Sequence, residues 1–154
     1  MRTNTRNSIF SLTLALSFGA AASASAGTDF GTHEDIMEML PDLVEYTAEN
    51  GSDAAIAAMD DPDHRFGATS LGLMIWVDGS MGMHNKYPDL AGIDFNQLQD
   101  LRGNYVIEEF TDAADAGGEY SLNYWPHYDT ETEYEYHCYS TWVEEPDIMV
   151  TACR

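Results

Sequence analysis

Basic residues are scarce in this sequence. Six lysines and arginines stand against 27 acidic residues, which leaves a net charge of −21 at pH 7. A surface of this sign repels nucleic acid and anionic lipid, so neither is expected as a partner. Two interpretations of the charge remain open. It attracts cationic ligands, or it keeps the protein soluble in a salty environment where counterions screen the self-repulsion.

Motifs of the common catalytic sites are also missing. The sequence contains no G-x-S-x-G elbow, no glycine-rich phosphate loop and no H-E-x-x-H pair. The densest group of possible metal ligands is Asp60, Asp61, Asp63 and His64, and it lacks the glycine and terminal glutamate of a calcium-binding loop. The sequence therefore predicts no enzyme, no metal site and no cofactor.

Cysteine occurs only twice, as Cys138 and Cys153. Residues 133–143 and 148–153 flank a turn and predict a β-hairpin. The register that pairs residue 143 with residue 148 also places the two cysteines directly opposite each other, where the Cβ separation suits a disulfide. Two cysteines without a second pair make a poor zinc signature. We therefore expect a disulfide, which an oxidising compartment would preserve.

Long hydrophobic runs are absent beyond the N-terminus. Arg2 and Arg6 precede an apolar stretch over residues 9–22, and residues 24–26 read Ala-Ser-Ala. This pattern predicts a secretory signal peptide with an A-x-A cleavage site, because the stretch is short for a membrane span. Cleavage would leave residues 27–154 as one soluble periplasmic domain without membrane insertion. An uncleaved N-terminal anchor is the alternative.

The first part of the remaining chain has the spacing of helices. Thr32 and Asp35 resemble a capping box, and apolar residues then recur at helical intervals. Gly51 is expected to end this helix, and Pro41 is expected to kink or split it. Ser52 is expected to cap a short second helix.

Strands dominate the rest of the chain, which predicts an α+β domain. We expect about five antiparallel strands, at residues 71–78, near 80–84, and at 119–125, 133–143 and 148–153. Both faces of residues 71–78 are apolar, which indicates a central strand. One helix is expected over residues 104–116, with Tyr105, Val106, Ile107 and Phe110 facing inward. The long loop before it, residues 86–103, is of a kind that is usually functional.

Several landmarks follow one another in order along residues 71–126. They are Asp78-Gly79, His84, Leu90-x-Gly92, Asp100-x-x-Gly103 and Tyr124-x-Pro126. In this order and spacing they resemble a Cache domain of the single-domain type, the extracytoplasmic small-molecule sensor module of bacterial receptors. The resemblance runs from about residue 42 to residue 153. It implies a PAS-like sheet with the N-terminal helix behind it and a ligand pocket in front, under the long loop and the inserted helix.

The resemblance also implies a set of ligand-binding residues. Trp76, Tyr105 and Trp125 are the expected walls, and His84 is the expected hydrogen-bonding group at the mouth of the loop. Tyr136 stands where the family usually carries a lysine that holds a carboxylate. This departure favours a neutral, zwitterionic or cationic ligand over a simple anion.

Two other positions depart from the family pattern. Asn85 follows His84 where proline is usual, so the loop is expected to be less rigid. The customary Gly-x-Tyr ending is replaced by Thr151-Ala152-Cys153.

The function expected from these features is that of a periplasmic protein that binds a small organic molecule. Such a protein senses its ligand or presents it to a partner, which could be a membrane receptor or another periplasmic protein. The alternative is a protein-interaction or structural module with a degenerate pocket. The aromatic residues fit both interpretations, because aromatic side chains also fill hydrophobic cores.

Overall fold

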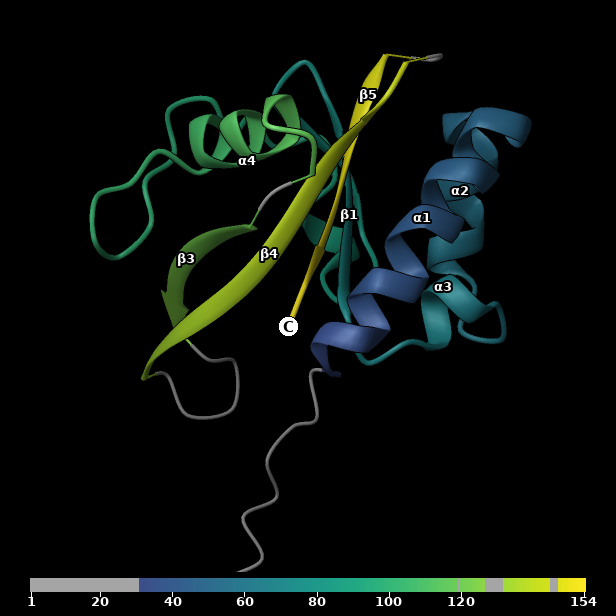
Figure 1. The fold of residues 1–154 in the computed structure, drawn as a ribbon, viewed down its shortest axis with the longest axis horizontal. Helices are drawn as coiled ribbons and strands as arrows, with labels where there is room; N and C mark the ends of the chain where they lie inside the picture. Colours follow the sequence, from purple (N-terminus) through teal and green to yellow (C-terminus); the bar gives the residue numbers. More distant parts are fainter. Residues whose placement is uncertain (1–30, 119, 127–131, 145–146) are drawn as a thin grey trace, which may run out of the picture.

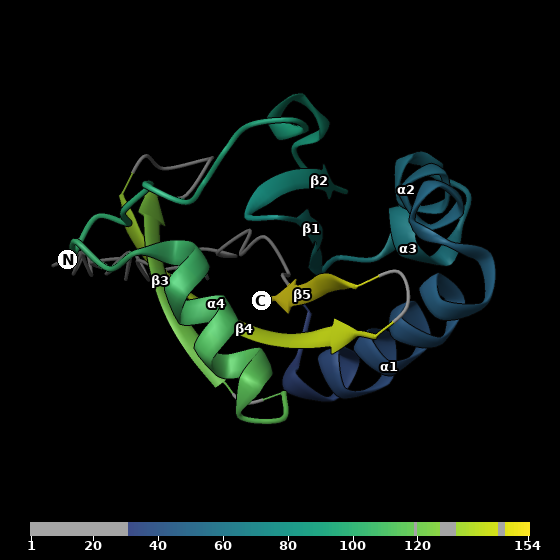
Figure 2. The ribbon, with the colours of Figure 1, turned by 90° about the horizontal axis from the view of Figure 1, so that it is seen from above.

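Five antiparallel strands form one sheet with the order β2-β1-β5-β4-β3. The strands are β1 (Gly72–Val77), β2 (Ser80–His84), β3 (Tyr120–Pro126), β4 (Glu133–Val143) and β5 (Ile148–Cys153). Helices α1 (His33–Asn50), α2 (Ser52–Asp60) and α3 (Arg65–Ala68) lie on one side of this sheet. Helix α4 (Val106–Asp115) lies on the other side, as Figures 1 and 2 show. This is the predicted PAS-like α+β fold.

The computed structural model describes residues 31–118, 120–126, 132–144 and 147–154. The predicted signal peptide, residues 1–26, lies outside the described residues. No helix in the described ranges combines the length and the apolarity that a membrane crossing requires.

Helix α1 begins and ends where its sequence signals lie. The Oγ1 of Thr32 accepts from the backbone N–H of Asp35 at 3.2 Å, and the Asp35 carboxylate accepts from the backbone N–H of Thr32 at 2.6 Å. Gly51 ends the helix with a positive φ of 84°. Pro41 lies inside one continuous helix, so the expected split is wrong. Its position is exposed, and water can satisfy the carbonyl that the missing N–H leaves unbonded.

The second helix starts one residue earlier than expected. Gly51 occupies its N-cap position without a side-chain hydrogen bond, and Ser52 is already helical, so the expected cap by Ser52 is wrong. The short helix α3 was not expected from the sequence. There the Nδ1 of His64 accepts from the backbone N–H of Phe66 at 3.3 Å, and Phe66 is buried against α1 and α2.

Strand β1 is buried on both faces, as predicted. Leu73 and Ile75 pack with α1 and α2 in one apolar cluster. Met74 and Trp76 point to the opposite face and pack in a second cluster with the long loop and α4. The second cluster forms the wall of the cavity described below.

Helix α4 presents a different face from the one expected. Val106 and Phe110 are buried, but Tyr105 is 38% exposed and Ile107 is only half-buried. Neighbouring helical residues diverge by about 100°, so residues adjacent to Val106 cannot share its inward direction. Tyr105 precedes the helix as its N-cap residue.

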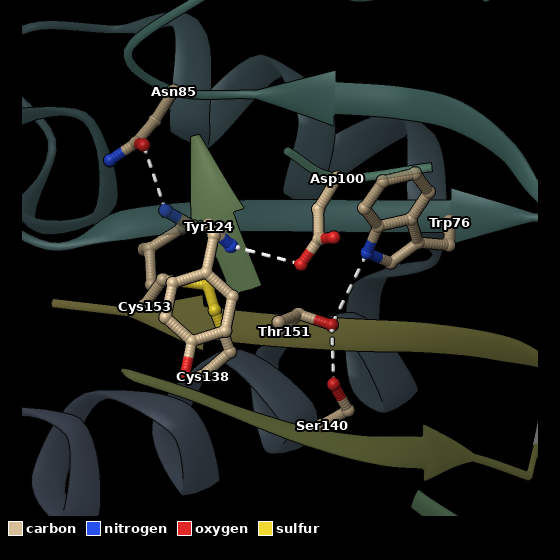
Figure 3. Close-up of a disulfide and its surroundings, with 9 residues drawn as sticks. Trp76, Asn85, Asp100, Tyr124, Cys138, Ser140, Thr151 and Cys153 are labelled. Atoms are coloured by element: carbon tan, nitrogen blue, oxygen red, sulfur yellow. Dashed lines mark hydrogen bonds between the residues drawn. A yellow bond between two sulfur atoms is a disulfide. The ribbon is translucent and has the colours of Figure 1, made fainter. Parts of the chain in front are cut away.

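The predicted hairpin register is confirmed. Val143 pairs with Ile148, and Cys138 pairs with Cys153. The two cysteines form a disulfide, as Figure 3 shows. Their Cα atoms lie 4.1 Å apart. The bridge therefore links adjacent strands in the middle of the sheet.

Candidate functional site

A cavity of about 710 Å³ lies between the sheet and the layer formed by the long loop and α4. This volume falls within the usual range of small-molecule sites. Most of the lining is apolar and aromatic, and it comes from every strand of the sheet, from the loop and from α4. The polar lining residues are few: Ser70, His84, Lys86, Tyr87, Asn123 and Tyr136.

Trp76 forms part of the cavity floor and of the core at the same time. Its side chain is only 2% exposed, and its ring meets Phe95 edge-on at a centroid distance of 5.2 Å. The indole Nε1 donates to the hydroxyl of Thr151 at 3.2 Å, and that hydroxyl bonds to Ser140 at 2.9 Å (Figure 3). Trp76 is therefore held in one orientation by hydrogen bonds and packing.

The structure brings four of the five expected ligand-binding residues to this cavity. Trp76, His84, Trp125 and Tyr136 line it. Tyr105 does not line it, because the adjacent Val106 takes the inward direction and Tyr105 points outward. The disulfide was expected as a structural bridge, but both of its cysteines also line the cavity. Sequence reasoning did not single out Lys86 or Asn123.

His84 is a neutral hydrogen-bond donor at the edge of the cavity. Burial, and to a smaller extent the charge on Lys86, lowers the pKa of His84 to about 4. The ring Nδ1 accepts from the backbone N–H of Lys86 at 3.1 Å. The single proton of the neutral ring is therefore assigned to Nε2, which can donate to a ligand oxygen.

Stability is expected to fall between pH 6.5 and pH 4 because of this histidine. The unfolded chain takes up a proton near pH 6.5, whereas folded His84 resists protonation until about pH 4. This histidine therefore costs no free energy of unfolding well above pH 6.5. The cost grows as the pH falls to about 4, because protons then bind preferentially to the unfolded chain. We expect a loss of about 2 kcal/mol after allowance for the partial exposure of the ring. Urea titrations of wild type and His84→Asn at both pH values measure it, and equal losses in the two proteins would contradict this assignment.

The family model described as a Cache domain matches residues 74–154 of the chain. The chain belongs to the Cache domain family. No curated protein matches it significantly.

Solved structures of chemotaxis and chemosensory proteins share its fold. A periplasmic sensor domain of a chemotaxis protein superposes with a TM-score of 0.60 at 20% identity, covering 79% of this chain and 90% of that one. A methyl-accepting chemotaxis protein from Vibrio parahaemolyticus superposes with a TM-score of 0.56 at 15% identity, covering 79% of this chain and 80% of that one. A Cache chemosensory domain, solved for the structural basis of carboxylic acid recognition, superposes with a TM-score of 0.55 at 18% identity. The match covers 80% of this chain and 98% of that one.

In this Cache domain, hydrogen bonds of Asn85 anchor the long loop directly after β2. The Oδ1 of Asn85 accepts from the backbone N–H of Leu73 at 2.8 Å, and its Nδ2 donates to the carbonyls of Phe66 and Leu71 at 3.0 and 3.1 Å. Three side-chain hydrogen bonds thus take over the restraint that a proline after His84 would supply. These hydrogen bonds argue against the expectation of a less rigid loop at this point.

The Cache domain also fastens the loop at its far end, through Asp100. Its carboxylate accepts from the backbone N–H groups of Arg102 and Asn104 at 2.9 Å each and from that of Tyr124 at 3.1 Å. Burial raises the pKa of Asp100, but the hydrogen bonds from Asn104, Arg102 and Tyr124 outweigh it and leave the pKa below its usual value. Two of the sequence landmarks, Asp100 and Tyr124, are therefore in direct contact (Figure 3).

Proposed function

We propose that this protein is an extracytoplasmic sensor domain that binds one small organic molecule between its sheet and its long loop. The observation that supports this proposal is the cavity itself, which combines apolar walls with a few polar groups. A membrane receptor or another periplasmic protein is the proposed recipient of the signal.

The proposed ligand site uses Trp76 and Trp125 as walls, with His84 and Tyr136 as polar groups. A degenerate interaction module would be expected to fill its pocket with side chains, whereas this cavity has the volume of a ligand site. We assign no catalysis to it, because both cysteines are bridged and the Nδ1 of His84 is occupied by a backbone N–H.

Export through the signal peptide is the second part of the proposal, and it rests on the N-terminal sequence. N-terminal sequencing of the exported protein tests it. Gly27 is the expected first residue, and a protein that begins at Met1 in the membrane fraction would overturn it.

A leucine at position 72 is expected to block ligand binding. Gly72 lines the cavity, and the nearest atoms to an added Cβ would belong to His84 and Cys153 at 3.5 Å or more, which is ordinary contact distance. The rest of the leucine side chain would then extend into the cavity and occupy it. A ligand present at 100 times its Kd stabilises the wild type by about 2.7 kcal/mol, and Gly72→Leu should lose this gain.

Thermal-shift screening with short carboxylates, amino acids and amines measures the effect. Val77→Leu is the matched control, because residue 77 lies on the opposite face of the same strand and is partly exposed. The control should respond to ligand as the wild type does. A ligand that raises the Tm of Gly72→Leu as much as that of the wild type would show that the site lies elsewhere.

A further inference from the structure

Asn123 is a buried amide that lacks the hydrogen bonds its chemistry requires. It is 1% exposed, and neither its Oδ1 nor its Nδ2 has a hydrogen-bond partner among the described residues. Buried side-chain polar atoms nearly always form hydrogen bonds, so an exception indicates a partner that is not among the described residues. Asn123 lines the cavity and shares a face of β3 with Trp125, which also lines it. The missing partner is therefore sought in the cavity.

The opposite edge of the cavity carries donors. His84 is the last residue of β2, and its ring is neutral. Lys86 lies two residues further along, and its ammonium donates to the carbonyl of Thr69. The ammonium has three N–H bonds, so it can also donate a hydrogen bond to a ligand. Among the residues that the structure describes, none with a carboxylate lines the cavity. This edge therefore suits an anionic oxygen group.

The two polar ends are separated by the width of the sheet. Strand β2, which carries His84, and strand β3, which carries Asn123, are the two outer strands. Four strand spacings lie between them, or about 19 Å along the sheet before side chains reach inward. The lining on the strands between them is mostly apolar, with Met74, Trp76 and the disulfide, and the polar Tyr136 on β4 is the strand partner of Asn123. A ligand that satisfies both ends must be elongated and apolar in its middle.

The amide of Asn123 selects the chemistry of the second ligand end. It offers one acceptor oxygen and two N–H donors. A second carboxylate would leave the acceptor unsatisfied, and an ammonium would leave the donors unsatisfied without a countercharge. An uncharged group that both donates and accepts, such as a carboxamide, satisfies both atoms in a reciprocal pair.

We propose that the cavity recognises a monocarboxylate whose apolar chain ends in an uncharged amide-type group, with Lys86 and His84 holding the carboxylate and Asn123 holding the amide. This proposal rests on the proposed ligand-binding function and deepens it. The sequence argument favoured ligands without a net negative charge, because Tyr136 replaces a lysine. Lys86 supplies a cation to the same cavity from a different element.

The first test compares ligands that carry one or both end groups. Calorimetry is done on the full exported protein with adipamic and suberamic acid, which have a carboxylate and a primary amide. Hexanoate, octanoate and octanamide carry one group only. We expect the better-fitting bifunctional acid to bind about tenfold more tightly than any of the three, which corresponds to one buried hydrogen-bond pair. Bifunctional acids that bind no more tightly than the single-group compounds would overturn the proposal.

The second test removes each polar end. Asn123→Leu should weaken the bifunctional acid about tenfold while octanoate binding is unchanged. The same substitution should raise the Tm of the unliganded protein, because it removes an unsatisfied buried amide. Ser121→Ala is the matched control: its hydroxyl is likewise buried and unbonded on the same face of β3, but it does not line the cavity. It should raise the Tm and leave both affinities unchanged.

The charged end has its own matched pair. Lys86→Gln should weaken both carboxylates and spare octanamide, whereas Arg65→Gln removes the same charge from α3 behind the sheet and should change no affinity. Equal effects of Asn123→Leu on octanoate and on the bifunctional acid would overturn the assignment of Asn123. The proposed function stands apart from this result, because any ligand whose binding Gly72→Leu abolishes still occupies the cavity.

Discussion

Replacing Trp76 with alanine is expected to lower the free energy of unfolding by about 3–5 kcal/mol, the usual cost of removing a large buried aromatic side chain. Trp76 is 2% exposed and packs against Phe95 and Phe110 in the cluster between the sheet and α4. Its loss also leaves the Thr151 hydroxyl with Ser140 as its remaining partner. Because whole domains are stable by only about 5–15 kcal/mol, this variant is near the limit of folding.

Urea-induced unfolding of the wild type, Trp76→Ala and Trp142→Ala measures this difference. Trp142 is the same residue type, but it is 38% exposed and its Nε1 donates to Asp115 at the surface. We expect its removal to cost about 1 kcal/mol or less. Similar losses for the two variants would contradict the central position of Trp76. Trp76→Phe should keep most of the packing and recover part of the stability.

Loss of the disulfide is expected to be the second large effect. The bridge between Cys138 and Cys153 closes a loop with a sequence separation of 15. The chain-entropy model assigns about 3 kcal/mol to a loop of this size, because the bridge restricts the unfolded chain. The double variant Cys138→Ala/Cys153→Ala should therefore unfold at lower urea concentration than the oxidised wild type. Both positions line the cavity, so we also expect weaker ligand binding.

Reductant supplies the control for this experiment. It should destabilise the wild type, raise its intact mass by two hydrogens and leave the double variant unchanged. Two free thiols in freshly purified exported protein would contradict the bridge. An oxidised wild type no more stable than the double variant would contradict its energetic role.

The local signals in the sequence predicted those parts of the fold that depend on residues close along the chain. The pairing of Cys138 with Cys153 followed from the length of one turn, because antiparallel register is set by the hairpin loop. The capping box at Thr32 and Asp35 followed from a spacing of three residues. The central position of β1 followed from apolar residues on both of its faces.

Residues on irregular backbone were predicted less well. Tyr105 was expected inside because it is aromatic, but the first turn of α4 directs Val106 inward and leaves Tyr105 outside. Asn85 was expected to loosen the loop, but its amide bonds to three backbone groups, one on α3, one on the segment that joins α3 to β1, and one on β1. Neither side-chain orientation could be predicted from composition, because each depends on the backbone path where a loop joins a helix or a strand.

By itself, the sequence determined the family, the α+β class, the strand register of the last hairpin and the disulfide. The class, the register and the disulfide follow from periodicity and spacing, which are local properties, whereas the family follows from the resemblance carried by the sequence landmarks. Only the tertiary structure decided which side chains share the cavity. Lys86 and Asn123 are far apart along the chain and lie at opposite edges of the sheet, and both line the same cavity because five strands pair in the order β2-β1-β5-β4-β3. That order is set by contacts distant in sequence, which no local pattern encodes.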